Sequence, residues 1–339
     1  MINKLLNPKK FHDPILLADL DSDELKQMLK KMIIIRKTEQ KLADGRKKGL
    51  IGGPVHLSVG QEAIAVGISQ SLKKSDRIFG NHRSHSHLMA INQNFYKLFA
   101  EVLGKKTGFS KGMGGSMHLY DQPNGFYGST PIVAGTVPLA VGAAMASKMQ
   151  DLDDIAVSYL GDGAVEEGVV HECFNLSKIL KAPILFVIEN NLFASHMHIS
   201  LRQTSPAVSR FALANDIPYE ILDGNDVVSV QKKSKVLINN IRKNKVPAII
   251  EAITYRWYGH VDWREDIDVG VERSLKDIKN WKLRDPINRL SKSMIYNKIW
   301  TKIEESNFIN KIDREIETAW KKASSDSYPS SKSVLNYVY

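Results

Sequence analysis

Two polar residues, Asp162 and Asn191, stand 29 residues apart, each directly after an apolar run typical of a β-strand. A helix-like stretch, 167–180, separates them, so the pattern predicts a strand–helix–strand unit. Ligands of parallel α/β sheets bind beyond the carboxyl ends of the strands. Carboxylate, amide and carbonyl oxygens are the ligands that Mg²⁺ takes when it also holds a diphosphate. The pair therefore predicts a magnesium–diphosphate site, and the alternative is two unrelated turns rich in Gly and Asn.

The elements around this unit indicate an α/β fold with a mostly parallel, doubly wound sheet flanked by helices. We expect an N-terminal extension over 1–20, an α/β domain over 21–275 and a C-terminal helical segment over 276–339 packed on that domain. Ser22 is the expected cap of the first long helix. The Gly-rich stretch 105–131 is expected to be a long functional loop, and 261–275 an acidic loop. The expected helices are 22–48, 61–72, 94–104, 132–149 and most of 275–325, and the expected strands are 155–160, 184–189, 218–222 and 248–256.

The composition excludes several classes of protein. The chain has 339 residues, of which 43% are hydrophobic, enough for a large core. Its single cysteine, Cys173, excludes an internal disulfide and is expected to be a packed core thiol. No apolar run is long enough to span a membrane, and residues 1–14 do not read as a secretory signal, so we expect a cytoplasmic protein. The net charge is +10, but the lysines are scattered and no nucleic-acid motif accompanies them. A solvated surface is favoured over an acidic partner surface.

Several motifs, in this order, resemble the alpha subunits of the thiamine diphosphate-dependent first component of 2-oxo acid dehydrogenase complexes. That family includes the pyruvate, branched-chain and acetoin dehydrogenases. His82 stands before Arg83 where the pyruvate branch usually has Tyr, which is more similar to the acetoin branch. The motifs that carry the resemblance are 56–63, 81–87, 112–118, 132–140, Gly161-Asp162-Gly163 with Asn190-Asn191, and 255–260.

The resemblance implies thiamine diphosphate and Mg²⁺ as cofactors. Asp162, Asn191 and the backbone carbonyl of Phe193 would hold the metal. The amides of Gly163 and Ala164 at a helix start would attract phosphate oxygens, and Arg83 would bind one through its planar guanidinium unless it forms an internal ion pair. Pro131 occupies a position where the family often has Gly, and it has no N–H to offer a cofactor. The implied cofactor-binding residues are His82, Arg83, Val133, Gly161, Asp162, Gly163, Ala164, Asn191 and Phe193.

Histidines are the expected proton-transfer groups, because imidazole titrates near neutral pH. His56 and His260 are the candidate acid–base residues, and His85 is expected to contact substrate or a lipoyl arm. A hydrogen-bonded structural role is the alternative for each of them and for His87. Zinc binding by His82, His85 and His87 is a further alternative, but no thiolate or carboxylate completes a tetrahedral set.

The family's catalytic Glu comes from a separate beta subunit, which binds the pyrimidine half of the cofactor. The resemblance therefore implies an α₂β₂ heterotetramer, with 105–131 and 132–149 buried at the interface or packed within the chain. It also implies decarboxylation of a 2-oxo acid such as pyruvate, or cleavage of acetoin, and acyl transfer to a lipoyl acyltransferase component.

Two other functions stay open. A carboligase or non-oxidative decarboxylase with a non-lipoyl acceptor would fit the departures at Pro131 and Tyr258 and in the 261–268 loop, which lacks serine, so we expect no phosphorylation switch there. The last is a non-catalytic regulatory subunit, against which the intact candidate residues argue.

Overall fold

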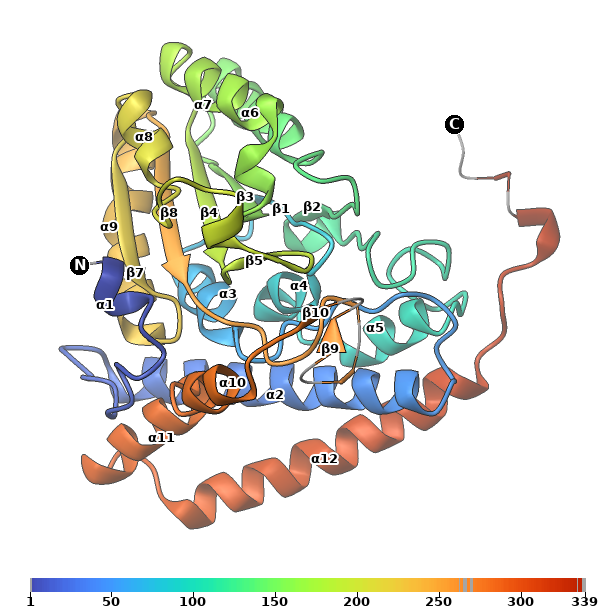
Figure 1. The fold of residues 1–339 in the computed structure, drawn as a ribbon. Helices are drawn as coiled ribbons and strands as arrows, with labels where there is room; N and C mark the ends of the chain where they lie inside the picture. The colour runs from blue at the N-terminus through green and yellow to red at the C-terminus, as the bar shows by residue number, and fades with distance from the viewer. Residues whose placement is uncertain (1, 262, 265–266, 269–270, 334, 337–339) are drawn as a thin grey trace.

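The centre of the protein is a six-stranded sheet with strand order β2-β1-β3-β4-β8-β7, and every paired strand runs parallel to its neighbour (Figure 1). The structure is a computed structural model that describes all residues except 1, 262, 265–266, 269–270, 334 and 337–339. The expected fold class, a mostly parallel α/β sheet flanked by helices, is confirmed.

The helices and strands alternate along most of the chain. The helices are α1 (Ile2–Leu5), α2 (Ser22–Lys47), α3 (Glu62–Ser69), α4 (His85–Ile91), α5 (Phe95–Val102), α6 (Val137–Met149), α7 (Gly168–Ile179), α8 (Arg210–Ala214), α9 (Val227–Asn244), α10 (Leu275–Lys282), α11 (Pro286–Tyr296) and α12 (Lys302–Ser325). The strands of the main sheet are β1 (Arg77–Phe79), β2 (Phe126–Gly128), β3 (Ala156–Gly161), β4 (Ile184–Asn190), β7 (Tyr219–Asp223) and β8 (Ala248–Ile253). Two small hairpins pair β5 (Phe193–Ala194) with β6 (Met197–His198) and β9 (Ile267–Asp268) with β10 (Val271–Glu272).

Alternate residues of each strand enter one of two hydrophobic cores, as the two-residue period of a strand requires. In β4, Leu185 and Val187 join the core that contains α2, α3, α5 and α9. Ile184, Phe186 and Ile188 join the core that contains α6 and α7. Figure 1 shows α6 and α7 on one side of the sheet and the long pair α2 and α12 on the other. The central strands are buried on both faces, which accounts for their continuous apolar sequences.

Both long helices, α2 and α12, begin after a residue whose side chain caps the first turn. Asp21, not the expected Ser22, caps α2: its side chain accepts a hydrogen bond from the amide of Asp23. Asp23 and Glu24 lie in the first turn of α2, where they complement the helix dipole. Thr301 caps α12 in the same way, and α12 packs against α2 and α5.

The expected helix over 132–149 is too long at its start. The helix begins at Val137, because Pro138 has no N–H and fits only the first helical turn. The residues before it form a turn in which Ala134 has a φ of 59°. Strands β1 and β2, with three residues each, are too short to show a period, and β2 lies inside the expected loop 105–131.

The structure also bears on the motif 81–87, on Cys173 and on the expected loop 261–275. Helix α4 lies over part of the motif 81–87 and was not expected. Cys173 is buried in the α6–α7 core, as expected, and burial raises the pKa of its thiol to about 11. Parts of the expected acidic loop 261–275 lie outside the described residues. Within the described part of the chain, no helix combines the length and the apolar character that crossing a membrane requires.

Candidate active site

A cavity of about 400 Å³ lies at the carboxyl ends of the central strands, where β1, β3, β4 and β8 each lead into a loop. Its lining contains every catalytic and cofactor-binding residue expected from the sequence except His85. We call this space the histidine cavity, because His56, His82 and His260 meet in it. Segments far apart in the sequence meet here because parallel strands deliver their carboxyl ends to one edge.

Asp162 is the buried carboxylate of this cavity, and it follows directly on β3. Its Oδ1 atom has no partner in hydrogen-bonding geometry among the described residues, while Oδ2 forms an ion pair with Arg202. Burial raises the pKa of Asp162, and the Arg202 guanidinium and the backbone amides of Asp162 and Asn191 act against that rise. An unpaired carboxylate oxygen inside a protein is costly, so this oxygen is suited to a cation that the cavity would receive.

The surroundings of Asp162 fit a metal–diphosphate group. The Asn191 side-chain oxygen accepts from the amide of Phe193 at 3.2 Å, which leaves it a second lone pair. A Cβ atom on Gly163 would lie 2.5 Å from the Cβ of Ala194, so only glycine allows the loop after β3 to pass this close. Arg202 already brings a positive charge to Asp162. The oxygen donors, and the positive charge that Arg202 places beside them, fit the chemistry of the expected Mg²⁺ site.

Three imidazoles also line the cavity. The ring centroids of His56 and His82 are 4.7 Å apart, those of His56 and His260 5.0 Å, and those of His82 and His260 5.3 Å. Burial, followed by the nearby Arg83 charge, lowers the pKa of His82 to about 3 and of His260 to about 2. The same causes hold the pKa of His56 far below its ordinary value. All three rings are therefore neutral at pH 7.

Arg83 connects two walls of the cavity. Its Nη1 atom donates to the carbonyl of Leu57 at 2.8 Å, and Nη2 donates to the carbonyl of His260 at 3.2 Å. Nη2 also lies 3.4 Å from His260 Nδ1. Because arginine can only donate, Nδ1 must accept, which places the proton of the neutral His260 ring on Nε2. One ring nitrogen from each of His56, His82 and His260 lies within 4.8 Å of the others, as in a transition-metal site, but the Arg83 charge opposes a cation there.

His85 lies outside the cavity lining, although we expected it at the substrate. Its side chain is fully buried, with Nδ1 3.2 Å from Glu39 and Nε2 2.9 Å from Ser116. His87 is equally buried and contacts Glu189 at 3.1 Å. Both histidines therefore have hydrogen-bond partners within the chain. The group of histidines close enough to share a metal ion in the described part of the chain is His56, His82 and His260, not the set His82, His85 and His87.

The segment before α6 forms the exposed edge of the cavity. Pro131 and Val133 line it, and Val133 is 52% exposed. The neighbouring Ile132 is 71% exposed.

Two residues at the site, Glu189 and Arg202, were not predicted from the sequence. Glu189 precedes the Asn-Asn pair and lines the cavity, so its place in the motif was an available signal. Arg202 comes from a loop that no motif marks.

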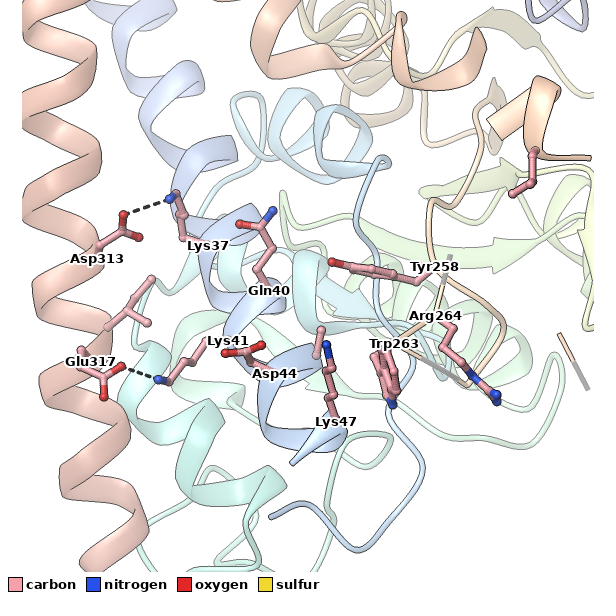
Figure 2. Close-up of a pocket in the computed structure, with 13 residues that line it drawn as sticks. Lys37, Gln40, Lys41, Asp44, Lys47, Tyr258, Trp263, Arg264, Asp313 and Glu317 are labelled. Carbon is pink, nitrogen blue, oxygen red and sulfur yellow. Dashed lines mark hydrogen bonds and ion pairs between the residues drawn. The ribbon is translucent and has the colours of Figure 1, made fainter. Parts of the chain in front are cut away.

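A larger hollow of about 840 Å³ lies between α2, α12 and the loop that follows His260 (Figure 2). We call it the α2–α12 groove. Two lysines on its wall are paired with acids of α12: Lys37 with Asp313 at 2.9 Å, and Lys41 with Glu317. Lys47 lies over the ring of Trp263, 5.1 Å from its centroid. The described groove carries no residue for which the sequence predicted chemistry, so size alone does not identify the active site.

Comparison with known proteins agrees with this geometry. Residues 30–332 match the family model described as "Dehydrogenase E1 component". The chain is similar to proteins named pyruvate dehydrogenase E1 component subunit alpha from several bacteria. It is 32% identical to that of Rhizobium meliloti over 88% of this chain and 85% of the relative, and 31% identical to that of Rickettsia typhi over 98% and 99%. It is 34% identical to that of Zymomonas mobilis over 81% and 77%. The family expected from the sequence is thus confirmed, and the chain belongs to the dehydrogenase E1 components, the thiamine diphosphate-dependent enzymes that decarboxylate 2-oxo acids.

Proposed function

We propose that this chain is the alpha subunit of a pyruvate dehydrogenase-type enzyme, which decarboxylates pyruvate and passes the acyl group to a lipoyl acceptor. The observation that carries this proposal is the histidine cavity itself. Asp162, a buried carboxylate with one oxygen unpaired among the described residues, lines a space that the Gly-rich turn after β3 and three neutral imidazoles also line. The names of the relatives support pyruvate as the substrate.

Asp162, Asn191 and the carbonyl of Phe193 would hold Mg²⁺ in this cavity. Arg202 already pairs with Oδ2 of Asp162, so the metal would take Oδ1 and the ion pair would weaken, because one carboxylate charge is then shared between two cations. The amides of Gly163 and Ala164 and the guanidinium of Arg83 would bind the diphosphate. When bound, thiamine diphosphate supplies the nucleophilic carbon and the electron sink that decarboxylation requires.

The histidines would handle protons and hydrogen bonds at the substrate. The Arg83 contact at Nδ1 leaves the proton of the neutral His260 ring on Nε2, as a hydrogen-bond donor. His56 keeps a buried Nδ1 atom with no hydrogen-bond partner among the described residues, so it is available to accept a proton or a hydrogen bond from the substrate. Each ring starts neutral, and a proton taken up by His56 would need a counter-charge, such as the substrate carboxylate, because a buried imidazolium is costly without one.

A beta subunit would cover the exposed edge of the cavity. Ile132 and Val133 at the edge, and Leu139 on α6, are exposed apolar residues of one continuous segment. Leu176 and Ile179 are further exposed apolar residues, on α7, which packs against α6. Such a patch is typical of an interface. We propose an α₂β₂ assembly in which the partner supplies the catalytic Glu and the pyrimidine half-site, with a lipoyl acyltransferase as the next component, in the cytoplasm.

The test is a turnover assay on the chain co-purified with its beta partner, with thiamine diphosphate and Mg²⁺. Pyruvate, larger 2-oxo acids and acetoin are supplied in turn with an artificial electron acceptor. We expect acceptor reduction with pyruvate that requires both cofactors. A preference for acetoin would agree with His82 standing where the pyruvate branch has Tyr. Carbon dioxide release without acceptor reduction would replace the proposal by a non-oxidative decarboxylase, and no cofactor binding by the complex would overturn both.

A further inference from the structure

A buried chain of hydrogen bonds connects α2 and α4 to the backbone of His56. Glu39 Oε2 lies 3.2 Å from His85 Nδ1, and His85 Nε2 lies 2.9 Å from Ser116 Oγ. Ser116 Oγ in turn accepts from the backbone N–H of His56 at 3.5 Å. All four residues are at most 5% exposed. Water therefore does not compete for these contacts, and a missing partner would leave a polar atom unsatisfied.

With Glu39 ionised and His85 neutral, only one arrangement of protons satisfies this chain. A carboxylate can only accept, so His85 Nδ1 carries the proton and donates to Glu39. Nε2 of His85 is then the acceptor, and Ser116 must donate its hydroxyl proton to it. The remaining lone pairs of Ser116 Oγ face the N–H of His56. The negative charge of Glu39 thus fixes the direction of every bond up to the backbone of His56.

The same carboxylate holds the segment after His56. Its Oε1 atom accepts from the Ser58 hydroxyl at 2.6 Å and from the Ser58 amide at 3.2 Å. Between these anchors, the Leu57 carbonyl accepts from Arg83 at 2.8 Å. Three successive residues are therefore held through their backbones. Among the described residues, the imidazole of His56 has no such partner at Nδ1, so its placement depends on the backbone from which it projects.

We propose that Glu39, His85 and Ser116 are positioning residues, which hold His56 in place for the reaction without touching the substrate. This inference rests on the proposed function, in which His56 acts at the substrate. It gives His85 a role behind the cavity rather than at the substrate. Misplacement of a catalytic group by about 1 Å can cost on the order of 10²-fold in rate, so a distant network can control turnover.

The experiment compares Ser116→Ala, Ser116→Thr and Glu39→Gln in the complex with the beta partner. Ser234→Ala is the matched control: Ser234 is also fully buried, and its hydroxyl donates to the carbonyl of Gln231 on α9. We expect Ser116→Ala to lower kcat by about 10-fold or more, with KM for pyruvate and the affinity for the cofactor within about twofold. Ser116→Thr keeps the hydroxyl and should recover most of kcat. Glu39→Gln should also lower kcat, because an amide cannot accept from both His85 and Ser58 through two oxygens.

A second readout does not depend on turnover. Modification of His56 by diethyl pyrocarbonate, followed by peptide mass spectrometry, should be faster in Ser116→Ala and Glu39→Gln than in Ser234→Ala. Equal kcat and equal modification rates in Ser116→Ala and Ser234→Ala would overturn the inference. A wild-type complex without turnover would instead contradict the proposed function, and the modification rates would still decide whether the network holds His56.

Discussion

The α2–α12 groove and the histidine cavity differ in how their charges are satisfied. In the groove, Lys37 and Lys41 each meet an acid of α12, and all four side chains keep contact with solvent. In the histidine cavity, which has about half the volume, Asp162 and His56 are buried, and each keeps a polar atom that has no partner in the described part of the chain. The reactive site is therefore marked by buried ionisable groups gathered in one cavity, and not by the volume of that cavity.

The largest expected effect is that of Asp162→Ala. Removal of the carboxylate takes away a metal ligand, so Mg²⁺-dependent cofactor binding and turnover should fall by about 10³-fold. Calorimetric titration of the complex with thiamine diphosphate and Mg²⁺, together with the turnover assay, measures both. Asp44→Ala in the groove is the matched change, and activity within twofold of wild type is expected for it. Equal losses in the two variants would show that the α2–α12 groove matters for activity as much as the histidine cavity does.

His56→Gln should lower kcat by about 10²-fold, the lower range for loss of an acid–base group. Glutamine cannot take up a proton, which lowers kcat. It retains hydrogen-bonding capacity, so the affinity for the cofactor should change little. Steady-state kinetics over pH 6–9 provides the comparison. A variant with normal kcat would show that His56 only lines the cavity.

Arg202→Ala should separate the stability of the cavity from its cation affinity. The guanidinium forms ion pairs with Asp162 and Glu166, and its loss leaves the buried Asp162 carboxylate uncompensated. The free energy of unfolding of the metal-free complex should fall by about 3 kcal/mol. Saturating Mg²⁺ and thiamine diphosphate should restore most of it, because the metal supplies a positive charge to the same carboxylate. Urea unfolding with and without both cofactors tests this, and a loss that the cofactors fail to reverse would show that no cation binds at Asp162.

The histidine cavity should also make stability depend on pH. In the folded protein the pKa of His82 is about 3 and that of His260 about 2, whereas in the unfolded chain both are about 6.5. Below pH 6.5 the unfolded state binds more protons, so stability is fully present above that pH and is lost as pH falls. Each such group contributes a slope of up to about 1.4 kcal/mol per pH unit. Urea unfolding between pH 7.5 and 5 should show a smaller slope for His260→Asn than for wild type; an unchanged slope would assign the dependence to other groups.

The smallest effect is expected in the groove. Lys41→Ala removes an ion pair with Glu317, which is partly exposed, and solvent screens such pairs. Stability should fall by less than about 1 kcal/mol, and kcat should remain within twofold of wild type. A double-mutant cycle with Glu317→Ala measures the pair alone. A large loss of kcat would mean that packing in the groove affects the position of the loop that carries His260.

The local sequence was sufficient to predict those features that depend on one strand and the turn that follows it. The strand before Asp162 and the strand before Asn191 are apolar runs whose ends lie at one edge of a parallel sheet, so their meeting followed from the fold class alone. The short strands β1 and β2 were missed, because three residues do not establish a period. The start of α6 was placed too early, although Pro138 was a visible signal.

The sequence by itself determined the family, the sheet and the carboxylate–amide pair, because motifs and periodicity are carried by residues close together in the chain. The tertiary structure decided which polar groups are paired. It brought His56, His82 and His260 together from three separate segments, joined Arg202 to Asp162, and enclosed His85 between Glu39 and Ser116. Those contacts depend on how loops pack over the sheet edge, and loop packing is set by the surrounding core rather than by the local sequence of each loop.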